Sequence, residues 1–438
     1  MIDGAGILAD SNFRSLLNLT ARRCISWEEF LGLPQPLNTS PLDTWEVLTE
    51  LNRCLGIPVN LPLSDGSLFW YRHTYQLDAV TRALECACGP HSKLFSITSA
   101  ITGQHFRMRS RAEEIIATAR LDGLEVDEDS ALQLLMLDRS PQTPVERVLV
   151  NMRNFSEHLP ELADLPFSRD LFQHVRAVLA DGVDESSLPR HARDLGTIAG
   201  LTAEPDEYTT RVAGWQSDLI ASFLNDITAD PDEVHVLQVL QTTDTFAFFR
   251  PVGPLSAMVG RLVARLFAIK KQIPMLGLLP ICRAKLRWEK GLIAPPVVSF
   301  TRDMLADLRG RDMLDNTAYH TTAAQLALLE LRDLEASIDA WERRDAEMRR
   351  ILHADRLLNP RQRSVLARAL RDPDAEFYTR YHQTNHNIHY ATARRDLREL
   401  HEKGYLNMDL RGKAYVFTRG PLLDKLAATS AERGADSR

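Results

Sequence analysis

The sequence lacks the features that mark membrane proteins and secreted disulfide scaffolds. Its most apolar stretch, residues 246–279, is interrupted by five arginine and lysine side chains, so it holds no 18-residue membrane span. The N-terminus has no basic segment followed by an apolar run, which argues against a secretory signal. Five scattered cysteines in 438 residues are an odd and sparse set for a disulfide framework. We therefore expect a cytoplasmic protein without a membrane-bound part.

Metal-ligand patterns are also weak. Cys86 and Cys88, with His91 nearby, form half of a zinc-like pattern, but no second cysteine pair completes it. His382, His386 and His389 are spaced by four and three residues, as ligands on one helical face can be. A turn predicted before His389 would break that face. We therefore expect free thiols, a polar helix surface and neither a metal nor a cofactor.

The composition is that of a globular protein, and its charge is unevenly distributed. Hydrophobic residues make up 44% and charged residues 25% of the chain, which excludes a mostly disordered or collagen-like protein. The length predicts two or three domains. The formal net charge is −7, but residues 351–438 carry +5 and the rest carries −12. A basic end on an acidic protein is typical of a module that meets nucleic acid.

Hydrophobic spacing predicts a mainly α-helical protein. Apolar residues recur every three or four positions, and strict alternation is rare. One segment, 196–212, is rich in threonine, glycine and β-branched residues and predicts a small β-hairpin flap. We expect an N-terminal helical region, a helical bundle, a long linking or dimerisation helix, a C-terminal module and a disordered tail. Their expected ranges are 1–105, 106–320, 321–353, 354–426 and 427–438.

The expected long helix carries an apolar seam in a heptad pattern. The seam consists of Leu331, Leu334, Ile338, Trp341, Met348 and Leu352. Packing within one chain is the simpler interpretation, because seams this short are common in helical proteins. Pairing with a second copy of the chain is the alternative. Asn359-Pro360 then ends the helix and begins the C-terminal module.

The C-terminal module has the element order of a winged helix-turn-helix. Three helical stretches, near 360–372, 375–386 and 389–403, are followed by two alternating runs joined at Arg411-Gly412. Asn387, Ile388 and His389 form the predicted turn between the second and third helices. Gly404 is placed to end the third helix. The segment from Thr392 to Leu406 resembles the recognition helix of bacterial regulators.

The third helix has one face for a core and one for a ligand. Ala393, Leu397 and Leu400 are predicted to be buried. Exposed residues near the start of such a helix reach base edges in the major groove, and basic residues at its end and in the wing meet phosphates. Asp396, Glu399 and Glu402 are expected to pair with neighbouring basic residues, away from DNA. The predicted DNA-binding residues are His389, Tyr390, Thr392, Arg394, Arg395, Arg398, Lys403, Arg411 and Lys413.

The stretch from Thr243 to Met275 resembles the core of the Fic family of AMP transferases. In that family, a loop H-P-F-x-D/E-G-N-G-R-x-x-R leads into a long buried helix and then a turn that ends in proline. Pro251 stands at the loop proline, Arg261 at the second arginine, and Gln272-Ile273-Pro274 at the final turn. Helix order extends the resemblance over most of residues 65–420. It implies a Fic-like helical bundle with a C-terminal winged helix-turn-helix.

The departures from the family motif remove its chemistry. Arg250 replaces the general-base histidine and cannot deprotonate near neutral pH. Pro254 replaces the acidic Mg²⁺ ligand, and Leu-Ser-Ala at 255–257 replaces the glycine-rich nest that binds phosphate. Met258 replaces the first arginine. The resemblance therefore implies a pseudoenzyme without catalytic residues. The degenerate loop comprises Arg250, Pro251, Pro254, Ser256, Met258 and Arg261.

An inhibitory motif of the same family has a counterpart upstream. Thr118, Asp122 and Gly123 match its S/T-x-x-x-E-G/N pattern, with aspartate in place of glutamate. In the family this acid pairs with the second arginine, so the resemblance implies a salt bridge between Asp122 and Arg261. A helix that ends at Gly123 is the simpler interpretation of the same residues.

Three functions remain open from the sequence. The leading hypothesis is a homodimeric transcription regulator that binds double-stranded DNA and uses its Fic-like part as a scaffold or a sensor of a small molecule or anion. The second is a divergent AMP transferase, for which residues such as His235 and Ser256 would have to replace the lost groups. The third is an adaptor or antitoxin-like module whose winged helix binds protein.

Overall fold

The computed structural model describes most residues of the chain. They are 4–37, 39–62, 68–100, 103–137, 139–184, 209–229, 235–293, 314–354, 358–371, 375–411 and 414–425. The chain divides into two compact units, residues 1–335 (the body) and 336–438, and the boundary falls inside one long helix. The protein is mainly α-helical with small antiparallel strand pairs, as the sequence predicts.

The N-terminal part of the body is a cluster of short, well-capped helices. They are α1 (Gly4–Ala9), α2 (Ser11–Arg22), α3 (Trp27–Leu31) and α4 (Pro41–Cys54). The side chains of Asp10, Ser26 and Ser40 accept hydrogen bonds from the first turns of α2, α3 and α4. Buried Phe13 and Phe30 lie in the core that these helices share.

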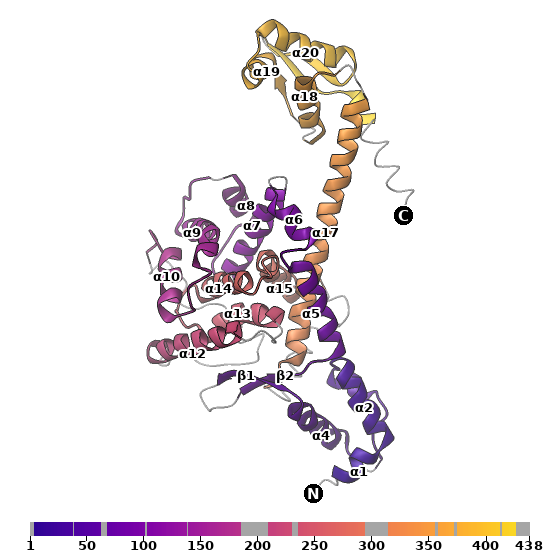
Figure 1. Ribbon diagram of the computed structural model, residues 1–438, viewed down its shortest axis with the longest axis vertical. Coiled ribbons are helices and arrows are strands. Elements are labelled where there is room, and N and C mark those ends of the chain that lie inside the picture. Colours follow the sequence, from indigo (N-terminus) through magenta and orange to yellow (C-terminus); the bar gives the residue numbers. More distant parts are fainter. Residues whose placement is uncertain are drawn as a thin grey trace. The chain divides into compact units, whose positions relative to one another are not determined.

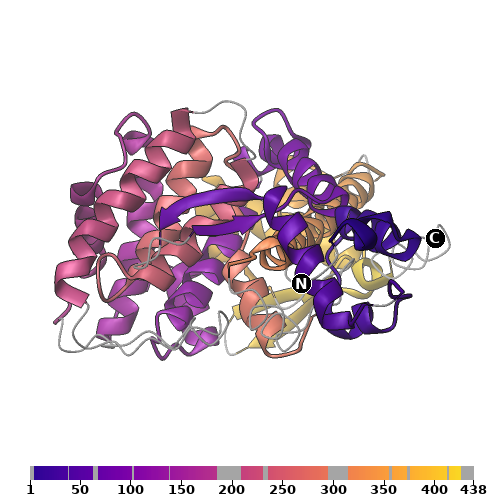
Figure 2. The same cartoon turned by 90° about the horizontal axis from the view of Figure 1, so that it is seen from below.

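A β-hairpin follows this cluster, at a place the sequence analysis missed. β1 (Ile57–Pro62) and β2 (Leu68–Tyr71) pair antiparallel, with Ile57 opposite Tyr71. Figure 2 shows the hairpin lying across the body helices, and β1 contacts α12. The hairpin predicted at 196–212 falls largely outside the described residues, and its last four residues are instead the first turn of α12.

The rest of the body is a bundle of helices. In chain order they are α5 (Tyr75–Cys88), α6 (Lys93–Ser99), α7 (Gln104–Leu121), α8 (Glu128–Leu137), α9 (Pro144–His158), the 3₁₀ turn η2 (Leu159–Leu162), α10 (Arg169–Leu179), α12 (Thr209–Ala229), α13 (His235–Phe249), α14 (Ser256–Lys270), the 3₁₀ turn η4 (Leu276–Leu278), α15 (Ile281–Glu289) and α17 (Thr317–Ala354).

Helix α14 is the centre of this bundle. Every residue from Ser256 to Ala268 is buried, Arg261 and Arg265 included, so the helix is enclosed on all sides. It contacts α7, α10, α12 and α13, and Figure 1 shows α13 and α14 side by side. Gly260 permits the approach of α13, because a Cβ atom there would lie 2.3 Å from Cβ of Phe246. The close packing of α13 and α14 therefore requires glycine at this position.

The long helix α17 begins earlier than the sequence predicts. It starts at Thr317, four residues before the predicted start, and Asp315 accepts a hydrogen bond from the backbone N–H of Thr317. Of the predicted seam, Leu331 and Ile338 are buried, and Leu334 and Trp341 are half-buried. The side chains of Met348 and Leu352 are not among those that the structure describes. Among the described residues, no helix is both long enough and apolar enough to cross a membrane.

The C-terminal module combines three helices with a three-stranded sheet. Its elements are α18 (Pro360–Arg371), β3 (Phe377–Tyr378), α19 (Thr379–His386), α20 (Tyr390–Glu402), β4 (Leu406–Arg411) and β5 (Ala414–Arg419). The strand order is β3-β5-β4, and all pairs are antiparallel. Buried Leu366, Leu397 and Phe417 join helices and sheet in one core. The second helix is shorter than predicted, because Phe377 and Tyr378 pair with β5 instead of joining it.

Candidate functional site

The exposed face of α20 is the candidate nucleic-acid interface. Ala393, Leu397 and Leu400 are fully buried, as predicted from the sequence. On the opposite side, Arg394, Arg395 and Arg398 are exposed, and Tyr390 is 52% exposed. Thr392 is half-buried. His389 stands at the N-cap of α20 and makes no capping bond through its side chain. The predicted base-contacting residues therefore lie on one side of one helix.

A buried polar cluster behind α20 fixes its position. Asp396 is 2% exposed and accepts hydrogen bonds from Asn359 (2.9 Å) and from Nε of Arg361 (2.7 Å). Nε2 of His382 lies 3.3 Å from the same carboxylate. The predicted pairing of Asp396 with a basic residue of its own helix is therefore wrong. Its partners come from the start of α18 and from α19, so the carboxylate joins all three helices.

The pKa values of Asp396 and His382 are both lowered in this cluster. Burial raises the pKa of Asp396, but the hydrogen bonds from Arg361, Asn359 and His382 outweigh it and hold that pKa below its usual value. Burial lowers the pKa of His382, against the opposing effect of Asp396. Glu399 accepts a hydrogen bond from Gln362 at 2.7 Å and lies 3.9 Å from Nε of Arg395. The predicted pairing of Glu399 with a basic residue of its own helix is therefore found, and its side chain stays 45% exposed.

The turn between α19 and α20 has the geometry that its residues predict. Asn387 ends α19 in the left-handed conformation, with φ 46°. Asparagine is one of the few non-glycine residues that tolerate this conformation. The backbone N–H of Ile388 donates to the carbonyl of Gln383, which closes the end of the helix. Ile388, the apolar residue of the turn, is half-buried.

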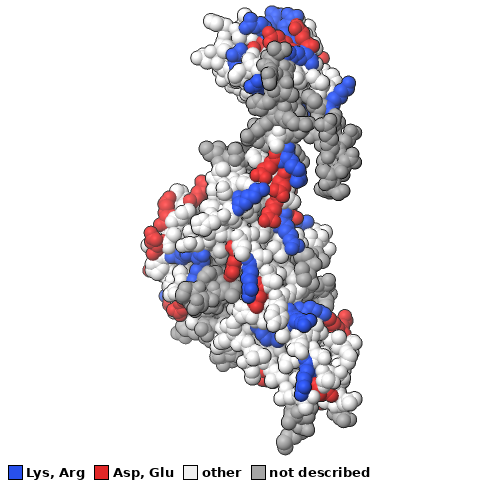
Figure 3. Space-filling model, turned by 45° about the vertical axis from the view of Figure 1, so that its right-hand side comes forward, with Lys and Arg blue, Asp and Glu red and all other residues white. Residues whose placement is uncertain are grey.

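The wing contributes an aromatic residue that the sequence analysis missed. The guanidinium of Arg394 lies 5.8 Å from the ring centroid of Tyr415, which is 41% exposed on β5. The alternation of Tyr415 with buried Val416 was the signal that could have found it. Lys403 is half-buried at the C-cap of α20. Arg411 ends β4, but its side chain lies outside the description, as does all of Lys413. In Figure 3, basic and acidic side chains lie together on this module.

The degenerate loop in the body is closed by its own contacts. Arg250, Gly253 and Leu255 all have positive φ values, of 51°, 74° and 68°. The hydroxyl of Ser217 donates to the carbonyl of Pro251 at 2.9 Å, and that of Ser256 donates to the carbonyl of Gly253 at 2.7 Å. Pro251 is buried and Pro254 half-buried. Hydrogen bonds therefore hold the loop in a shape with positive φ at Arg250 and Leu255, a conformation that is strained for residues other than glycine.

Asp122 caps the N-terminus of α14 across 136 residues of sequence. Leu255 is the N-cap residue and has no side-chain acceptor. Asp122 accepts hydrogen bonds from the backbone N–H groups of Ala257 (3.1 Å) and Met258 (2.7 Å). The carboxylate is 3% exposed, and burial raises its pKa to about 6 against the lowering effect of these bonds and of Arg250. A helix N-terminus of this kind attracts anions, and here the chain supplies its own.

Arg261 is paired with a residue other than the one predicted. It is 1% exposed, forms an ion pair with Glu114 and donates to the carbonyls of Gly277 and Leu279. Glu114 also accepts a hydrogen bond from the backbone N–H of Cys282 at 2.9 Å. Because Asp122 caps α14 and Glu114 holds the guanidinium, the predicted salt bridge between Asp122 and Arg261 is wrong.

The other residues of the inhibitory-like motif have structural positions. Thr118 is buried, and its hydroxyl donates to the carbonyl of Glu114 one turn earlier at 2.7 Å. Gly123 follows α7 with φ 80°, a conformation that favours glycine. The simpler interpretation of Asp122 and Gly123 as a helix end is therefore confirmed, with the added role of Asp122 as a cap.

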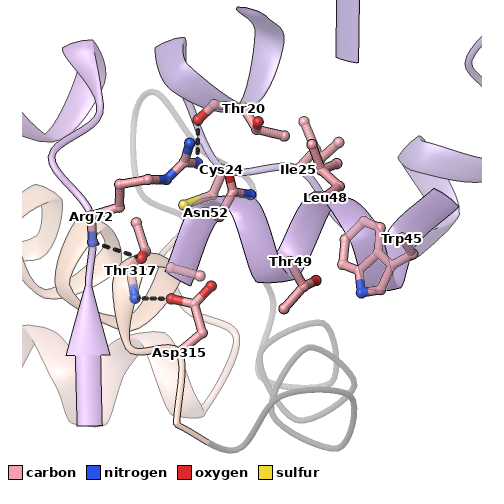
Figure 4. Close-up of a pocket in the computed structure, with 11 residues that line it drawn as sticks. Thr20, Cys24, Ile25, Trp45, Leu48, Thr49, Asn52, Arg72, Asp315 and Thr317 are labelled. Atoms are coloured by element: carbon pink, nitrogen blue, oxygen red, sulfur yellow. Dashed lines mark hydrogen bonds between the residues drawn. The ribbon is translucent and has the colours of Figure 1, made fainter. Parts of the chain in front are cut away.

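The described residues offer no metal centre or activated thiol. No group of three histidine, cysteine, aspartate or glutamate residues is placed to hold a metal among them. Cys86 is exposed while Cys88 is buried, and burial raises the pKa of the Cys88 thiol to about 12. A small cavity of about 60 Å³ adjoins Cys24 and Arg72, shown in Figure 4. Because of its small volume, this cavity has room for water only. Burial raises the pKa of the Cys24 thiol to about 12, and Arg72 donates to the carbonyl of Thr20.

Comparison of the chain with known proteins finds likeness among solved structures. No family model matches the chain, and no curated protein matches it. Among solved structures, the chain is similar to a Fic family protein from Desulfovibrio desulfuricans G20, with 14% identity and a TM-score of 0.45. The match covers 80% of this chain and 98% of that one. A likeness of this degree establishes neither a shared fold nor a shared activity, so the Fic family stays a resemblance carried by the residues of the loop and its helix.

Proposed function

We propose that this protein is a regulator that binds double-stranded DNA in a sequence-specific manner through α20 and the wing. The observation that carries the proposal is the arrangement of α20 itself. Arg394, Arg395 and Arg398 project from one side, and Asp396 on the opposite side is bonded to α18 and α19. A recognition helix needs this combination, because base readout requires side chains held in fixed register against the groove.

The placement of the acidic residues supports this proposal. By sequence, three acidic residues on α20 oppose its three arginines. Asp396 is withdrawn into the module by Arg361, whereas Glu399 is bonded to Gln362 and keeps a 45% exposed side chain beside Arg395. The exposed side of α20 is therefore more basic than the sequence count indicates. This arrangement favours DNA binding through a few arginines at fixed positions on α20. It does not resemble a uniformly basic surface.

We propose further that the body is a noncatalytic scaffold. The N-terminus of α14, where the family resemblance implies a nucleotide phosphate, holds Asp122. A phosphate there would have to displace a buried carboxylate, and two anions could not share the site without a large electrostatic cost. Arg250 has no proton-accepting form near neutral pH. These features support a pseudoenzyme, and homodimerisation would allow two half-sites about one DNA turn apart to be read together.

The test is DNA binding by the full-length protein. We expect DNA from around its own gene to be bound more tightly than random DNA of the same length, in fluorescence anisotropy at two salt concentrations. Arg394→Ala is expected to reduce discrimination between the two, because a base contact is worth about 1–3 kcal/mol. Lys413→Ala is expected to weaken binding to all sequences alike and to reduce the salt dependence. Arg169→Ala, on helix α10 of the body, is the matched control.

Two results would contradict the proposal. Absence of binding at low salt would exclude DNA as the ligand of α20 and favour a protein partner. Equal binding to all sequences would reduce the interaction to electrostatics. Titration with ATP by calorimetry tests the scaffold separately, because tight Mg²⁺-dependent binding would restore the transferase hypothesis.

A further inference from the structure

A second pocket lies in the body, away from the degenerate loop. It has a volume of about 590 Å³ and opens between the first half of α7, the junction of α9 with η2, and the second half of α14 with η4. Pockets for small molecules fall in this size range. Its lining from α14 includes Arg265 and Ile269, whereas Asp122 bonds the other end of the helix at 257–258. The rise of an α-helix separates the two places by about 12–18 Å.

Arg265 is the unusual residue of this pocket. It is 8% exposed, yet among the described residues no carboxylate lies within 4.0 Å of its guanidinium and no acceptor is hydrogen-bonded to it. Glu114 and Glu157, the acidic side chains whose charges act on Arg265, are paired with Arg261 and Arg111. Burial, together with the charges of Arg111 and Arg261, lowers the pKa of Arg265 well below its usual value. A buried cation in such surroundings is costly unless something else compensates it.

Arg111, on helix α7, also has a hydrogen-bond donor without an acceptor among the described residues. One of its terminal nitrogens donates to Glu157 at 3.0 Å, but its Nε is buried and without an acceptor among the described residues. Arg107 lines the pocket one turn earlier and is half-buried. Of the charged side chains in the lining, three are arginines and one is Glu157. The pocket therefore carries a positive excess and unused hydrogen-bond donors.

The rest of the lining is uncharged and combines apolar side chains with the polar side chains of two serines and two glutamines. Phe95, Met108 and Ile269 supply much of the apolar part, and none of the three is fully buried. η4 packs tightly behind Arg265, because a Cβ atom on Gly277 would lie 3.2 Å from the Cα of Arg265. The backbone at Arg265 is thus packed against η4, and its side chain is part of the pocket lining. An apolar cavity with a few convergent polar groups is the usual form of a small-molecule site.

We propose that this pocket binds a small organic anion. Its carboxylate or phosphate group accepts hydrogen bonds from Arg265 and Arg111, and its apolar part packs against Phe95, Met108 and Ile269. Arginine forks match both anionic groups, and charge-assisted hydrogen bonds of this kind are about twice as strong as neutral ones. The proposal does not depend on DNA binding, because every residue in it belongs to the body.

Calorimetry on the full-length protein tests the proposal with three defined probes. Benzoate and phenyl phosphate carry the two anionic groups, and benzamide has the shape of benzoate without the charge. We expect at least one anion to bind and benzamide to bind at least about tenfold more weakly. Which anion binds more tightly distinguishes a carboxylate ligand from a phosphate ligand.

Substitutions identify the residues responsible. Arg265→Met and Arg111→Met are each expected to lower the affinity for the bound anion at least about tenfold. Arg265→Met is also expected to melt at a temperature no lower than the wild type without ligand, since it removes an uncompensated buried charge. Arg169→Met, in which an exposed arginine outside the pocket is changed, should bind as the wild type does.

Three results would overturn the proposal. They are absence of binding by both anions, equal binding of benzamide, and unchanged affinity in both pocket variants. A lower melting temperature of Arg265→Met would also count against it, because it would give the guanidinium a structural role.

Discussion

At the residue scale, the body is organised around charges that point inward. Asp122, Glu114 and Arg261 are all at least 95% buried, and each has backbone partners as well as or instead of an opposite charge. Asp122 replaces the missing N-cap side chain of α14, and Glu114 fixes Arg261 and the start of α15 together. Removing one partner of such a buried pair costs about 3–5 kcal/mol, because the other charge is left uncompensated.

Asp122 gives a pH-dependent prediction. Its folded pKa of about 6 lies above the value of about 3.9 expected in the unfolded chain. The folded state therefore binds more protons between these values, and the contribution of Asp122 to stability is fully present below about pH 4 and declines as the pH rises to about 6. Asp122→Asn removes this decline. We expect the stability of the variant relative to the wild type to increase from pH 4 to pH 7 by up to about 3 kcal/mol.

Denaturant unfolding of both proteins at several pH values measures this difference. The slope with pH is the test, because the amide also loses one acceptor and so adds a constant offset. Asp181→Asn, at an exposed position of the body, is the control and should give a flat difference. A flat difference for Asp122→Asn would contradict the raised pKa of Asp122, because it would mean that the capping hydrogen bonds fully offset the effect of burial.

At the scale of elements, the junction of α19 and α20 decides where the candidate recognition helix begins. Asn387 holds the left-handed conformation at this point, and Asp396 bonds α20 to α18 and α19. The turn sets the direction of α20, and the polar cluster sets its rotation. A change in either is expected to move Arg394 and Arg398 relative to a DNA groove without changing them.

The turn can be tested by two substitutions at one position. Asn387→Val is expected to weaken the module by about 1–2 kcal/mol, because a β-branched residue resists positive φ. Asn387→Gly should be nearly neutral, because glycine adopts this conformation freely. Amide hydrogen exchange over α20 in the full-length protein reports the local opening free energy. Equal effects of valine and glycine would show that side-chain bonds of Asn387, and not its backbone, hold the turn.

At the scale of the whole molecule, the chain contains separate cores joined by one continuous helix. The module has its own core around Leu366, Leu397 and Phe417, and the body core is built around α14. The boundary between the two units falls within α17. The backbone hydrogen bonds of α17 continue through the boundary. Cooperative unfolding depends more on side-chain packing within each core than on one connecting helix.

We therefore expect two calorimetric transitions in the full-length protein. Leu397→Ala creates a cavity in the module and should lower one transition, at a cost of about 2–5 kcal/mol. Asp122→Ala removes the cap of α14 and should lower the other. A single transition that both substitutions lower together would mean that α17 couples the two units into one cooperative structure.

The sequence by itself determined the helical class, the three helices and wing of the C-terminal module, the buried face of α20 and the turn at Asn387. These follow from local rules of periodicity, capping and backbone preference, which need only neighbouring residues. The boundaries of α17 and α19 were less well predicted, because tertiary contacts decide whether residues such as Phe377 join a helix or a strand.

Only the tertiary structure decided which charges meet. Asp122 bonds residues 257 and 258, Glu114 pairs with Arg261, and Asp396 turns inward to Arg361, and each partner lies far away in sequence. The spacing of residues along a helix predicts local pairs, but a buried charge is satisfied by whichever donors the packing brings near. For the same reason, the pocket around Arg265 had no sequence signal. Its three arginines come from two helices that meet only in the folded chain.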